Sequence, residues 1–468
     1  MSILRQAIGT AIVCYGCFTM GLIYTWPSST VKLFSSSNTT LNRQMTETEI
    51  ALFGSLSSIS ALICTPICGF LLDVLGRKKS CIWFSVPQVI AWSIVCVLPR
   101  VEAVLVAVVI SGFSGCVLLI SPVYVSEICQ ESIRGRMTSG SIVFYGVGML
   151  VSYLLGGFLN YHTMNYICLG LVVLGTALIT FIADSPTYLM KKGQEREAAK
   201  AIAFYRAAKI DSKVVVEEMN TIRRSLNPEM DHETPDHEKL KPDLKAPEKL
   251  SFWKFMKKSR SSRQAFALTL ALYTAVVFQG LVAMQVYAEP LFQEAIPNMS
   301  STLSSVLFAV VTVVASFTAA SLVDKAGRRA LMIYASIGCG ICCVVLGTQI
   351  QFHWGPHWLT AVFMNFYTIT YTFGAGTVPY VIVAEVFLPE IRSIASMLAV
   401  EYAWICNFII LFVFNDMLSL LGLGGVFHFF AAVCFVSAVF CFFYLPETSG
   451  LTVDVIQGLF KNPRRRLD

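Results

Sequence analysis

Long apolar runs recur along almost the whole chain, and they constrain its fold more than any other feature. A helix needs about 20 apolar residues to cross the hydrocarbon core of a bilayer. Runs of this length lie at about 7–27, 48–72, 80–99, 102–126, 137–159 and 163–183, and again at 264–290, 301–323, 330–351, 358–385, 394–418 and 424–445. Because lipid offers no partners to backbone groups, each run is expected to be helical. The pattern predicts an all-α membrane protein with twelve transmembrane helices in two six-helix bundles.

The composition excludes several other classes of protein. Only 14% of the residues are charged, whereas soluble domains carry about 25%, so a soluble fold could not hydrate these runs. No basic stripe is interleaved with aromatic residues, which argues against nucleic-acid binding despite a net charge of +6. The 15 cysteines lie mostly inside apolar runs, where they are expected to pack helices, so we predict no disulfide, no metal site and no cofactor. No nucleophile constellation or nucleotide-binding loop predicts an enzyme.

The polar stretches divide the chain into four parts. We expect one six-helix bundle at 1–183, a cytoplasmic linker at 184–263, a second bundle at 264–445 and a short tail at 446–468. Within the linker, Gln194–Lys209 has the spacing of an amphipathic helix, with Ala198, Ile202 and Tyr205 on one face. The stretch 227–249 is rich in proline and charged residues and is predicted to be a mobile linker.

The distribution of basic residues predicts the orientation. If the linker is cytoplasmic, both termini are cytoplasmic too, and of the 35 Lys and Arg residues all but Lys32, Arg43 and Arg100 lie on that side. The opposite orientation would violate the positive-inside rule. Two N-x-S/T sequons, at Asn38 and Asn298, then fall in outside loops and are candidate glycosylation sites. We expect a multi-pass protein of the plasma membrane.

A set of charged residues returns in the same order in the two halves of the chain. The first half carries Asp73, Arg77, Glu127 and Arg134, and the second half carries Asp324, Arg328, Glu385 and Arg392. Each Asp lies three residues before a glycine, which permits a tight turn, and each Arg follows that glycine. The halves therefore share one plan. Parallel repeats of this kind place a solute site between the halves, near the middle of the membrane.

Several motifs resemble those of the sugar porters of the major facilitator superfamily. They are the two Asp-x-x-Gly-Arg repeats, Pro122–Glu127 with Arg134-Gly135, Asp184-Ser185-Pro186, Gly376–Tyr380 with Glu385, and Trp404 with Asn407. The likeness covers about residues 15–455 and is strongest to the branch of insect facilitated trehalose transporters. It implies a monomeric carrier in the lipid bilayer that moves a small solute, such as trehalose, a hexose or a related polyol, by alternating access.

The repeated charged residues are candidates for a gating network. An Arg can bind a carboxylate through two parallel hydrogen bonds, so Arg77 and Arg328 are expected to hold acidic partners from neighbouring helices and keep the inner gate shut. The alternative is that these charges only mark cytoplasmic loops. The chain departs from the family at Val108 and Thr187, where the resemblance implies Arg, so the network of the first half is expected to be the weaker one.

The substrate path is less polar than the resemblance implies. The family's amide positions fall on Ile142, on Val276 or Val277, on Val282 and on Thr312. The candidates for solute binding are Gln279, Gln285, Tyr287, Tyr380, Asn407, Trp404 and Thr312, expected to face the cavity between the halves. The alternative for Gln279, Gln285 and Asn407 is hydrogen bonding between helices. Either the solute is held by fewer hydrogen bonds than a typical hexose, or it is not a simple sugar.

The acidic residues within the helices bear on coupling to protons. The first predicted helix carries no acid, which favours facilitated diffusion. Glu401 lies within the eleventh predicted helix, and an ionisable residue in a membrane is a functional candidate by default. It could couple transport to protons, or be a partner of the inner gate. The competing functions are therefore a proton-coupled carrier of another small solute and a non-transporting nutrient sensor, although the short tail argues against a sensor.

Overall fold

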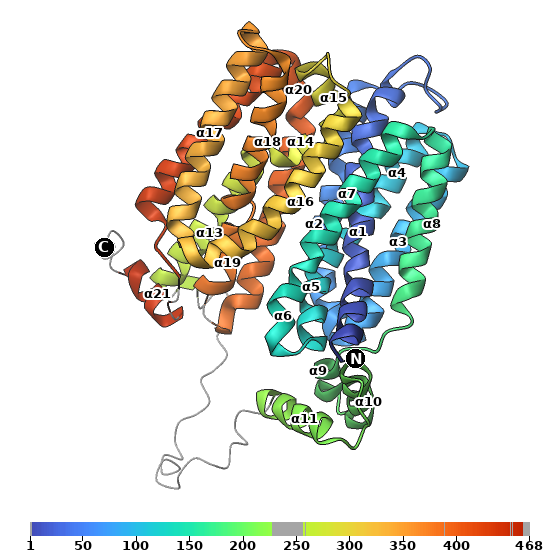
Figure 1. Ribbon diagram of the computed structural model, residues 1–468, viewed down its shortest axis with the longest axis vertical. Helices are drawn as coiled ribbons and strands as arrows, with labels where there is room; N and C mark the ends of the chain where they lie inside the picture. Colours follow the sequence, from blue (N-terminus) through green and yellow to red (C-terminus); the bar gives the residue numbers. More distant parts are fainter. Residues whose placement is uncertain are drawn as a thin grey trace.

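The computed structural model describes residues 2–226, 256–257, 259–387, 389–449, 451 and 453–461. Every regular element among these residues is helical, and most helices gather in two bundles that stand side by side (Figure 1). The N-terminal bundle contains α1 (Ser2–Ser35), α2 (Glu47–Leu75), α3 (Arg77–Val97), α4 (Val101–Gly112), a 3₁₀ turn (Phe113–Cys116), α5 (Val117–Ile128), α6 (Glu131–Thr138), α7 (Gly140–Phe158) and α8 (Tyr161–Ile179).

Three short helices follow the N-terminal bundle and lie at one end of it (Figure 1). They are α9 (Pro186–Lys191), α10 (Glu195–Arg206) and α11 (Lys213–Leu226), and we call this end of the molecule the linker end. The C-terminal bundle contains α13 (Arg260–Phe278), α14 (Leu281–Val286), α15 (Ala288–Ala295), α16 (Ser301–Ala326), α17 (Arg328–Phe352), α18 (His357–Phe373), α19 (Val378–Val386) and α20 (Pro389–Tyr444), and α21 (Val453–Lys461) follows it.

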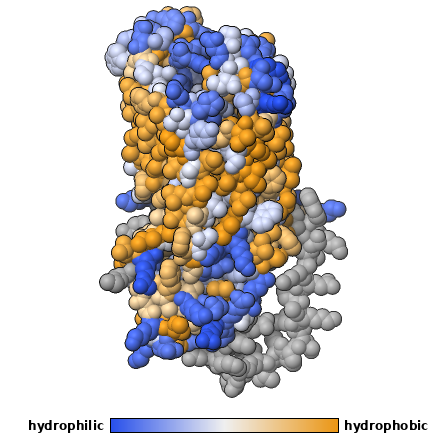
Figure 2. Space-filling view, turned by 90° about the vertical axis from the view of Figure 1, so that its right-hand side faces the viewer, coloured by the Kyte–Doolittle hydropathy of each residue, from blue (hydrophilic) through white to orange (hydrophobic). Residues whose placement is uncertain are grey.

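The surface identifies a multi-pass membrane protein. Ten segments of the described chain are long and apolar enough to cross a bilayer. An apolar band covers the middle of the molecule and polar residues cover its two ends (Figure 2). Large apolar side chains such as Phe158 and Val436, 67% and 68% exposed, project from this band. A surface of this kind is stable only where it faces lipid.

Several helices that the sequence predicts as continuous are broken. The run predicted at 264–290 forms α13, α14 and α15, with breaks at Gly280 and Tyr287. Gly280 has a φ of 100°, and a Cβ there would lie 2.4 Å from the ring of Phe430, so only glycine fits. The run predicted at 358–385 is interrupted between α18 and α19. The runs predicted at 394–418 and 424–445 both lie within α20 and are separated at Gly422, whose φ of 68° and ψ of 167° are not helical.

The described parts of the linker and of the tail contain helices. The amphipathic helix predicted at Gln194–Lys209 is confirmed as α10, which buries Ala198, Ile202 and Tyr205. The predicted mobile stretch, 227–249, lies outside the described residues. The segment 446–468, predicted as a short tail, contains α21, which packs on the C-terminal bundle and buries Ile456 and Phe460 in its core.

Candidate functional site

The two bundles are in contact at the end opposite the linker end. The Tyr153 hydroxyl donates a hydrogen bond of 2.7 Å to the Gln285 carbonyl, and the Glu289 backbone N–H donates one of 2.9 Å to Ser28 Oγ. The large core of the C-terminal bundle continues into Tyr153 and neighbouring residues of the N-terminal bundle. At Gly54, a Cβ would lie 2.0 Å from the Tyr287 hydroxyl. The bundles are therefore closed against each other at this end.

Charged residues face one another across the same closure. Lys32 at the end of α1 interacts electrostatically with Glu289 and Glu294 of α15. Burial raises the pKa of the Glu289 and Glu294 carboxyls, and the Lys32 ammonium lowers it by a smaller amount. These carboxyls therefore bind protons more readily in the closed arrangement than they would in open water.

Acidification should consequently favour the closed arrangement at this end. The arrangement in which the carboxyl pKa is higher is stabilised as the pH falls, so the effect is fully present below the ordinary glutamate pKa of about 4.3 and is lost as the pH rises through the raised values. Spin labels at Ser37→Cys and Asn298→Cys, one exposed position on each bundle, would report the population of the short distance as a function of pH. Removing both carboxyls, by Glu289→Gln with Glu294→Gln, should abolish the dependence, and an unchanged response would contradict this assignment.

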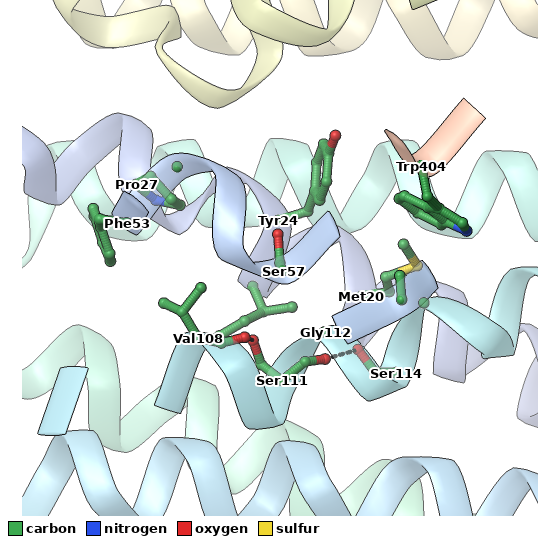
Figure 3. Close-up of a pocket in the computed structure, with 14 residues that line it drawn as sticks. Met20, Tyr24, Pro27, Phe53, Ser57, Val108, Ser111, Gly112, Ser114 and Trp404 are labelled. Carbon is green, nitrogen blue, oxygen red and sulfur yellow. Dashed lines mark hydrogen bonds between the residues drawn. The ribbon is translucent and has the colours of Figure 1, made fainter. Parts of the chain in front are cut away.

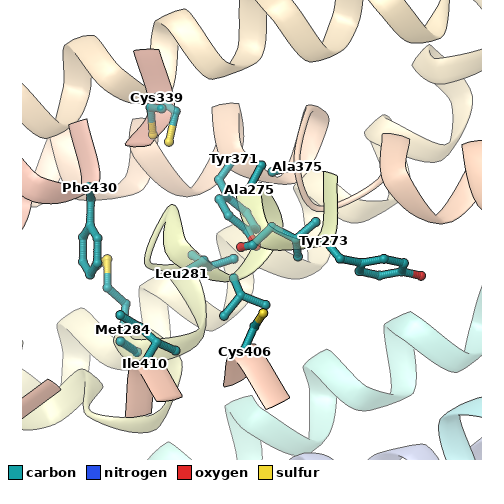
Figure 4. Close-up of a cluster of buried hydrophobic side chains, with 14 of the residues drawn as sticks. Tyr273, Ala275, Leu281, Met284, Cys339, Tyr371, Ala375, Cys406, Ile410 and Phe430 are labelled. Carbon is teal, nitrogen blue, oxygen red and sulfur yellow. The ribbon is translucent and has the colours of Figure 1, made fainter. Parts of the chain in front are cut away.

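Tyrosines from both bundles meet between them. Tyr380 of α19 is 55% exposed, although its ring packs edge-on against Tyr273 of α13 with centroids 5.6 Å apart. In the N-terminal bundle the rings of Tyr24 and Tyr145 lie 6.3 Å apart, and both residues are within electrostatic reach of Tyr380. Tyr273 points away from the apolar cluster around it (Figure 4). Tyr380 therefore lines an accessible space between the bundles.

A small cavity lies beside Tyr24. It has a volume of about 30 Å³ and is lined by α1, α2, α4 and the 3₁₀ turn of the N-terminal bundle, with Trp404 of the C-terminal bundle at its edge (Figure 3). The hydroxyl of Tyr24 points out of the cavity (Figure 3). A cavity of this size holds about one water molecule and is too small for a sugar ring. Trp404 contacts the N-terminal bundle here, since a Cβ at Gly115 would lie 3.5 Å from its ring.

Two residues predicted to face this space do not face it. Gln279 is completely buried in the C-terminal bundle, and its amide donates a long hydrogen bond of 3.4 Å to Ser336 Oγ of α17. Its side chain therefore does not reach the accessible space in this arrangement, and its Oε1 has no hydrogen-bond partner among the described residues. Thr312 is buried as well, and its hydroxyl donates to the Phe308 carbonyl of its own helix at 2.8 Å. Gln279 therefore links two helices of the C-terminal bundle, whereas Thr312 bonds only within its own helix.

The remaining candidates lie nearer the interface of the bundles. Gln285 and Tyr287 are buried, and the Tyr287 ring stacks on Phe414 with centroids 5.2 Å apart. Asn407 is half-buried, and its Oδ1 has no hydrogen-bond partner in the described part of the chain. Glu401, also half-buried in α20, makes no hydrogen bond or ion pair with any described residue. It is therefore not paired with a described residue of the gating network in this structure. An amide oxygen without a partner is a group that a solute or a water molecule would satisfy.

The repeated charged residues form a cluster at the linker end of the N-terminal bundle. Arg77 Nη2 lies 2.7 Å from Glu127 Oε1, and the Ser185 hydroxyl donates to the other oxygen of Glu127. Asp184 accepts a hydrogen bond of 3.1 Å from the Lys78 backbone N–H. The cluster therefore joins the start of α3, the end of α5 and the chain that follows α8.

The C-terminal bundle repeats this arrangement. Arg328 Nη2 lies 2.8 Å from Glu385 Oε1, and the Thr448 hydroxyl donates to Glu385 Oε2 at 2.7 Å. Glu447 accepts a hydrogen bond of 2.9 Å from the Arg328 backbone N–H, and Ser449 Oγ accepts one of 2.8 Å from Arg328 Nη1. Each cluster therefore lies within one bundle and braces its linker end.

The sequence interpretation missed half of the second cluster. Glu447 and Thr448 were assigned to the tail, although the pair follows the last helix of its bundle as Asp184 and Ser185 follow α8. That parallel is the signal that could have found them. The close approach of Glu447 also requires glycine at position 327. Gly327 has a φ of 81°, and a Cβ there would lie 2.7 Å from the Glu447 carboxylate.

The other predicted gating residues are placed differently. Asp73 pairs with Lys191 of α9 at 3.0 Å, a partner that the sequence did not suggest. Arg134 is exposed and forms no ion pair among the residues that the structure describes. The side chains of Asp324 and Arg392 lie outside the described part of the chain. The sequon residues Asn38 and Asn298 are both exposed, in the loops after α1 and before α16.

Three thiols offer the one metal-like grouping among the described residues. The sulfur atoms of Cys339, Cys343 and Cys434 lie within 4.8 Å of one another, between α17 and α20. Thiolates in this number can bind soft metal ions. All three are enclosed in the apolar core of the C-terminal bundle, where thiols pack as small apolar groups.

Comparison with known proteins connects this geometry to a family. The family model described as "Sugar (and other) transporter" matches residues 3–460. The facilitated trehalose transporter Tret1 of Polypedilum vanderplanki is 26% identical over 99% of this chain and 90% of its own length, and Tret1 of Drosophila yakuba is 26% identical over 99% and 52%.

Solved structures show the same fold. The inward-open xylose transporter XylE from E. coli superposes with a TM-score of 0.77 at 19% identity, covering 96% of this chain and 98% of that one. XylE bound to 6-bromo-6-deoxy-D-glucose gives a TM-score of 0.73 at 19% identity, covering 98% and 100%. Both are proteins of the major facilitator superfamily by fold. With its family model matched almost from end to end, the chain belongs to the sugar (and other) transporter family and is a membrane transporter rather than an enzyme.

Proposed function

We propose that the chain is a facilitative carrier of a sugar, with trehalose the first solute to test, and that it works by alternating access. The observation that carries the proposal is the placement of Tyr380. Its ring is 55% exposed between bundles that are closed against each other at the end opposite the linker. A solute beside Tyr380 could therefore leave only toward the linker end. The names of the Tret1 relatives supply trehalose as the candidate.

The proposed architecture has twelve transmembrane helices. Among the ten apolar segments, the one at Ile394–Tyr444 has 51 residues and is divided by the kink at Gly422, so it counts as two. The pair α18 and α19 forms one more crossing. The bundles then correspond to 1–183 and 264–445, joined by the linker 184–263. Because one chain contains both bundles, we propose that a monomer is complete.

The proposed orientation places the linker end in the cytoplasm of a cell, at the plasma membrane. The basic residues favour it, and the exposed sequons Asn38 and Asn298 lie at the opposite end. Epitopes at both termini and in 227–249 should be accessible to antibody only after permeabilisation. Staining of the 227–249 epitope in intact cells would overturn the orientation.

Uptake by reconstituted vesicles tests the function. Labelled trehalose should equilibrate across the membrane down its gradient, with a rate that saturates and with little dependence on an imposed proton gradient. Glucose and a polyol should be measured in parallel, because the path has fewer amides than the family pattern. Vesicles that take up none of these solutes would reject the proposal.

The second candidate function is a proton-coupled carrier, and one observation favours it. Glu401 is half-buried within an apolar helix and has no partner among the described residues, which makes its carboxyl available for a proton. An inward proton gradient that drives solute uphill, and that no longer does so in Glu401→Gln, would establish coupling. A nutrient sensor, the third alternative, would bind solute without moving it across the membrane.

We propose a solute site made of candidates that lie near the interface of the bundles. We retain Tyr380, Asn407, Trp404, Gln285 and Tyr287, and assign Gln279 and Thr312 to the packing of the C-terminal bundle. The repeated charged residues keep their proposed gating role, because their clusters lie at the end that must close when the opposite end opens.

Asn407→Leu tests this site. The change keeps the size of the side chain and removes both hydrogen-bonding groups, so it should weaken apparent solute affinity by about 1–3 kcal/mol if Asn407 Oδ1 binds solute. The measurement is the concentration dependence of uptake. Gln279→Leu is the matched control: it removes the same amide function from a buried position and should lower thermal stability while affinity stays unchanged. Equal effects of the two variants on affinity would contradict the assignment.

A further inference from the structure

A groove at the linker end of the N-terminal bundle is not used by the proposed transport cycle. It has a volume of about 1020 Å³ and lies between the ends of α2, α3 and α8 on one side and the helices α9 and α10 on the other. Four lysines line it: Lys78, Lys79, Lys192 and Lys200. The groove therefore combines a large open volume with a concentration of positive charge.

The acidic residues of the groove leave part of this charge unbalanced. Glu197 forms an ion pair with Lys200 at 2.6 Å, and Asp184 accepts hydrogen bonds from the backbone of Lys78 and of the following serine. Lys79 and Lys192 have no carboxylate partner among the residues described by the structure. The Lys192 ammonium lies over the ring of Tyr188 at 5.8 Å. Two ammonium groups are thus available to an anion.

Apolar side chains line both sides of the same groove. On the bundle side, Phe181, two residues after α8, is 75% exposed and Val74 at the end of α2 is 44% exposed; on the linker side, Phe204 of α10 is 40% exposed. A soluble phosphate compound would leave these exposed apolar side chains uncovered. An anionic lipid has both acyl chains that can cover them and a headgroup that the lysines can bind.

We propose that this groove binds an anionic phospholipid of the leaflet on the linker side. The headgroup phosphate lies between the ammonium groups of Lys79 and Lys192, and the acyl chains run along Phe181 toward the bilayer. Because the groove is formed by both the bundle and the linker helices, the lipid joins them beside the Arg77 cluster. The inference concerns a separate surface and does not depend on which solute the protein carries.

Lipid retention by the purified full-length protein tests the proposal. The protein in neutral detergent is titrated with phosphatidylinositol 4-phosphate or with phosphatidylcholine, and bound lipid is counted by native mass spectrometry. A third titration uses inositol 1,4-bisphosphate, which has the same kind of headgroup without acyl chains. The double change Lys79→Gln with Lys192→Gln should weaken binding of the anionic lipid roughly 30-fold, at about five-fold for each lysine near a membrane surface.

Two matched double variants test whether the lysines of the groove bind the lipid through their charge or whether any loss of lysine charge from the protein has the same effect. Lys209→Gln with Lys213→Gln removes the same charge from exposed positions outside the groove and should leave retention unchanged. Lys79→Arg with Lys192→Arg keeps the charge and should keep binding. Undiminished retention after Lys79→Gln with Lys192→Gln would overturn the proposal, as would loss of binding in the arginine variant. Equal binding of the soluble bisphosphate would overturn the lipid assignment in favour of a free phosphate ligand.

Discussion

Arg328→Ala should lower the stability of the protein by about 3–5 kcal/mol, the usual cost of removing one partner of a buried ion pair. The Arg328 side chain is almost fully buried and binds Glu385 and Ser449 at 2.8 Å each. Its removal leaves the Glu385 carboxylate without its cation in a site that is three-quarters buried. For a bundle of this size the melting temperature should fall by roughly 10 °C. Thermal unfolding in detergent, followed by tryptophan fluorescence, measures it.

Two further alanine variants locate the cause of that loss. Arg77→Ala removes the matching residue of the N-terminal bundle and should cost less, because beside its one carboxylate the Arg77 side chain binds a backbone carbonyl whereas Arg328 binds the Ser449 hydroxyl, and the family's additional Arg is replaced by Val108. Arg100→Ala makes the same chemical change at an exposed position and should shift stability by less than about 0.5 kcal/mol. A loss at Arg328 no larger than at Arg100 would show that the cluster does not stabilise the bundle.

Gly54→Val should hold the bundles apart at the end opposite the linker and arrest transport. A Cβ at Gly54 would lie 2.0 Å from the Tyr287 hydroxyl and 2.8 Å from the ring carbon that carries it. The ring cannot turn aside without losing its stacking on Phe414, at an interplanar angle of 7°. Overpacking costs about 1–3 kcal/mol, which moves a two-state equilibrium by about five- to 150-fold.

The distance between spin labels at Ser37→Cys and Asn298→Cys measures this shift, and uptake measures its consequence. Gly69→Val is the matched control, because Gly69 lies on the same helix and a Cβ there meets nothing within 4 Å. It should leave both the distance distribution and the rate of uptake unchanged. If Gly54→Val kept the short distance populated as in the unmodified protein, the contact between α2 and Tyr287 would not be part of the closure.

These two predictions concern different steps of alternating access. The Arg328 cluster lies within one bundle, so its loss should weaken the bundle as a rigid unit. Gly54 lies between the bundles, so its change should alter the balance of conformations while each bundle stays folded. Arg328→Ala should therefore change mainly the melting temperature, and Gly54→Val mainly the distance between the labels. Measuring both quantities for both variants separates the two effects.

The sequence by itself determined the apolar helical segments and the pairing of Arg77 with Glu127 and of Arg328 with Glu385. The reason is local: lipid requires every backbone group to bond within its own segment, so an apolar run of sufficient length has one outcome. The partners of Arg77 and Arg328 were accessible to sequence reasoning for a similar reason. Each Arg follows a glycine turn at a helix end, where a charged side chain has few neighbours to choose from.

Tertiary structure alone decided which way the polar residues within the helices point. In a helix that is apolar on all sides, sequence periodicity does not tell the face toward a neighbour from the face toward the solute path. Gln279 therefore points into its own bundle, whereas Tyr24, Tyr145 and Tyr273, which no motif singled out, lie with Tyr380 between the bundles. The contacts of Asp73 with Lys191 and of Arg328 with Glu447 depend on chain segments far apart in sequence. Only the packing of the linker and of the final segment onto the bundles creates them.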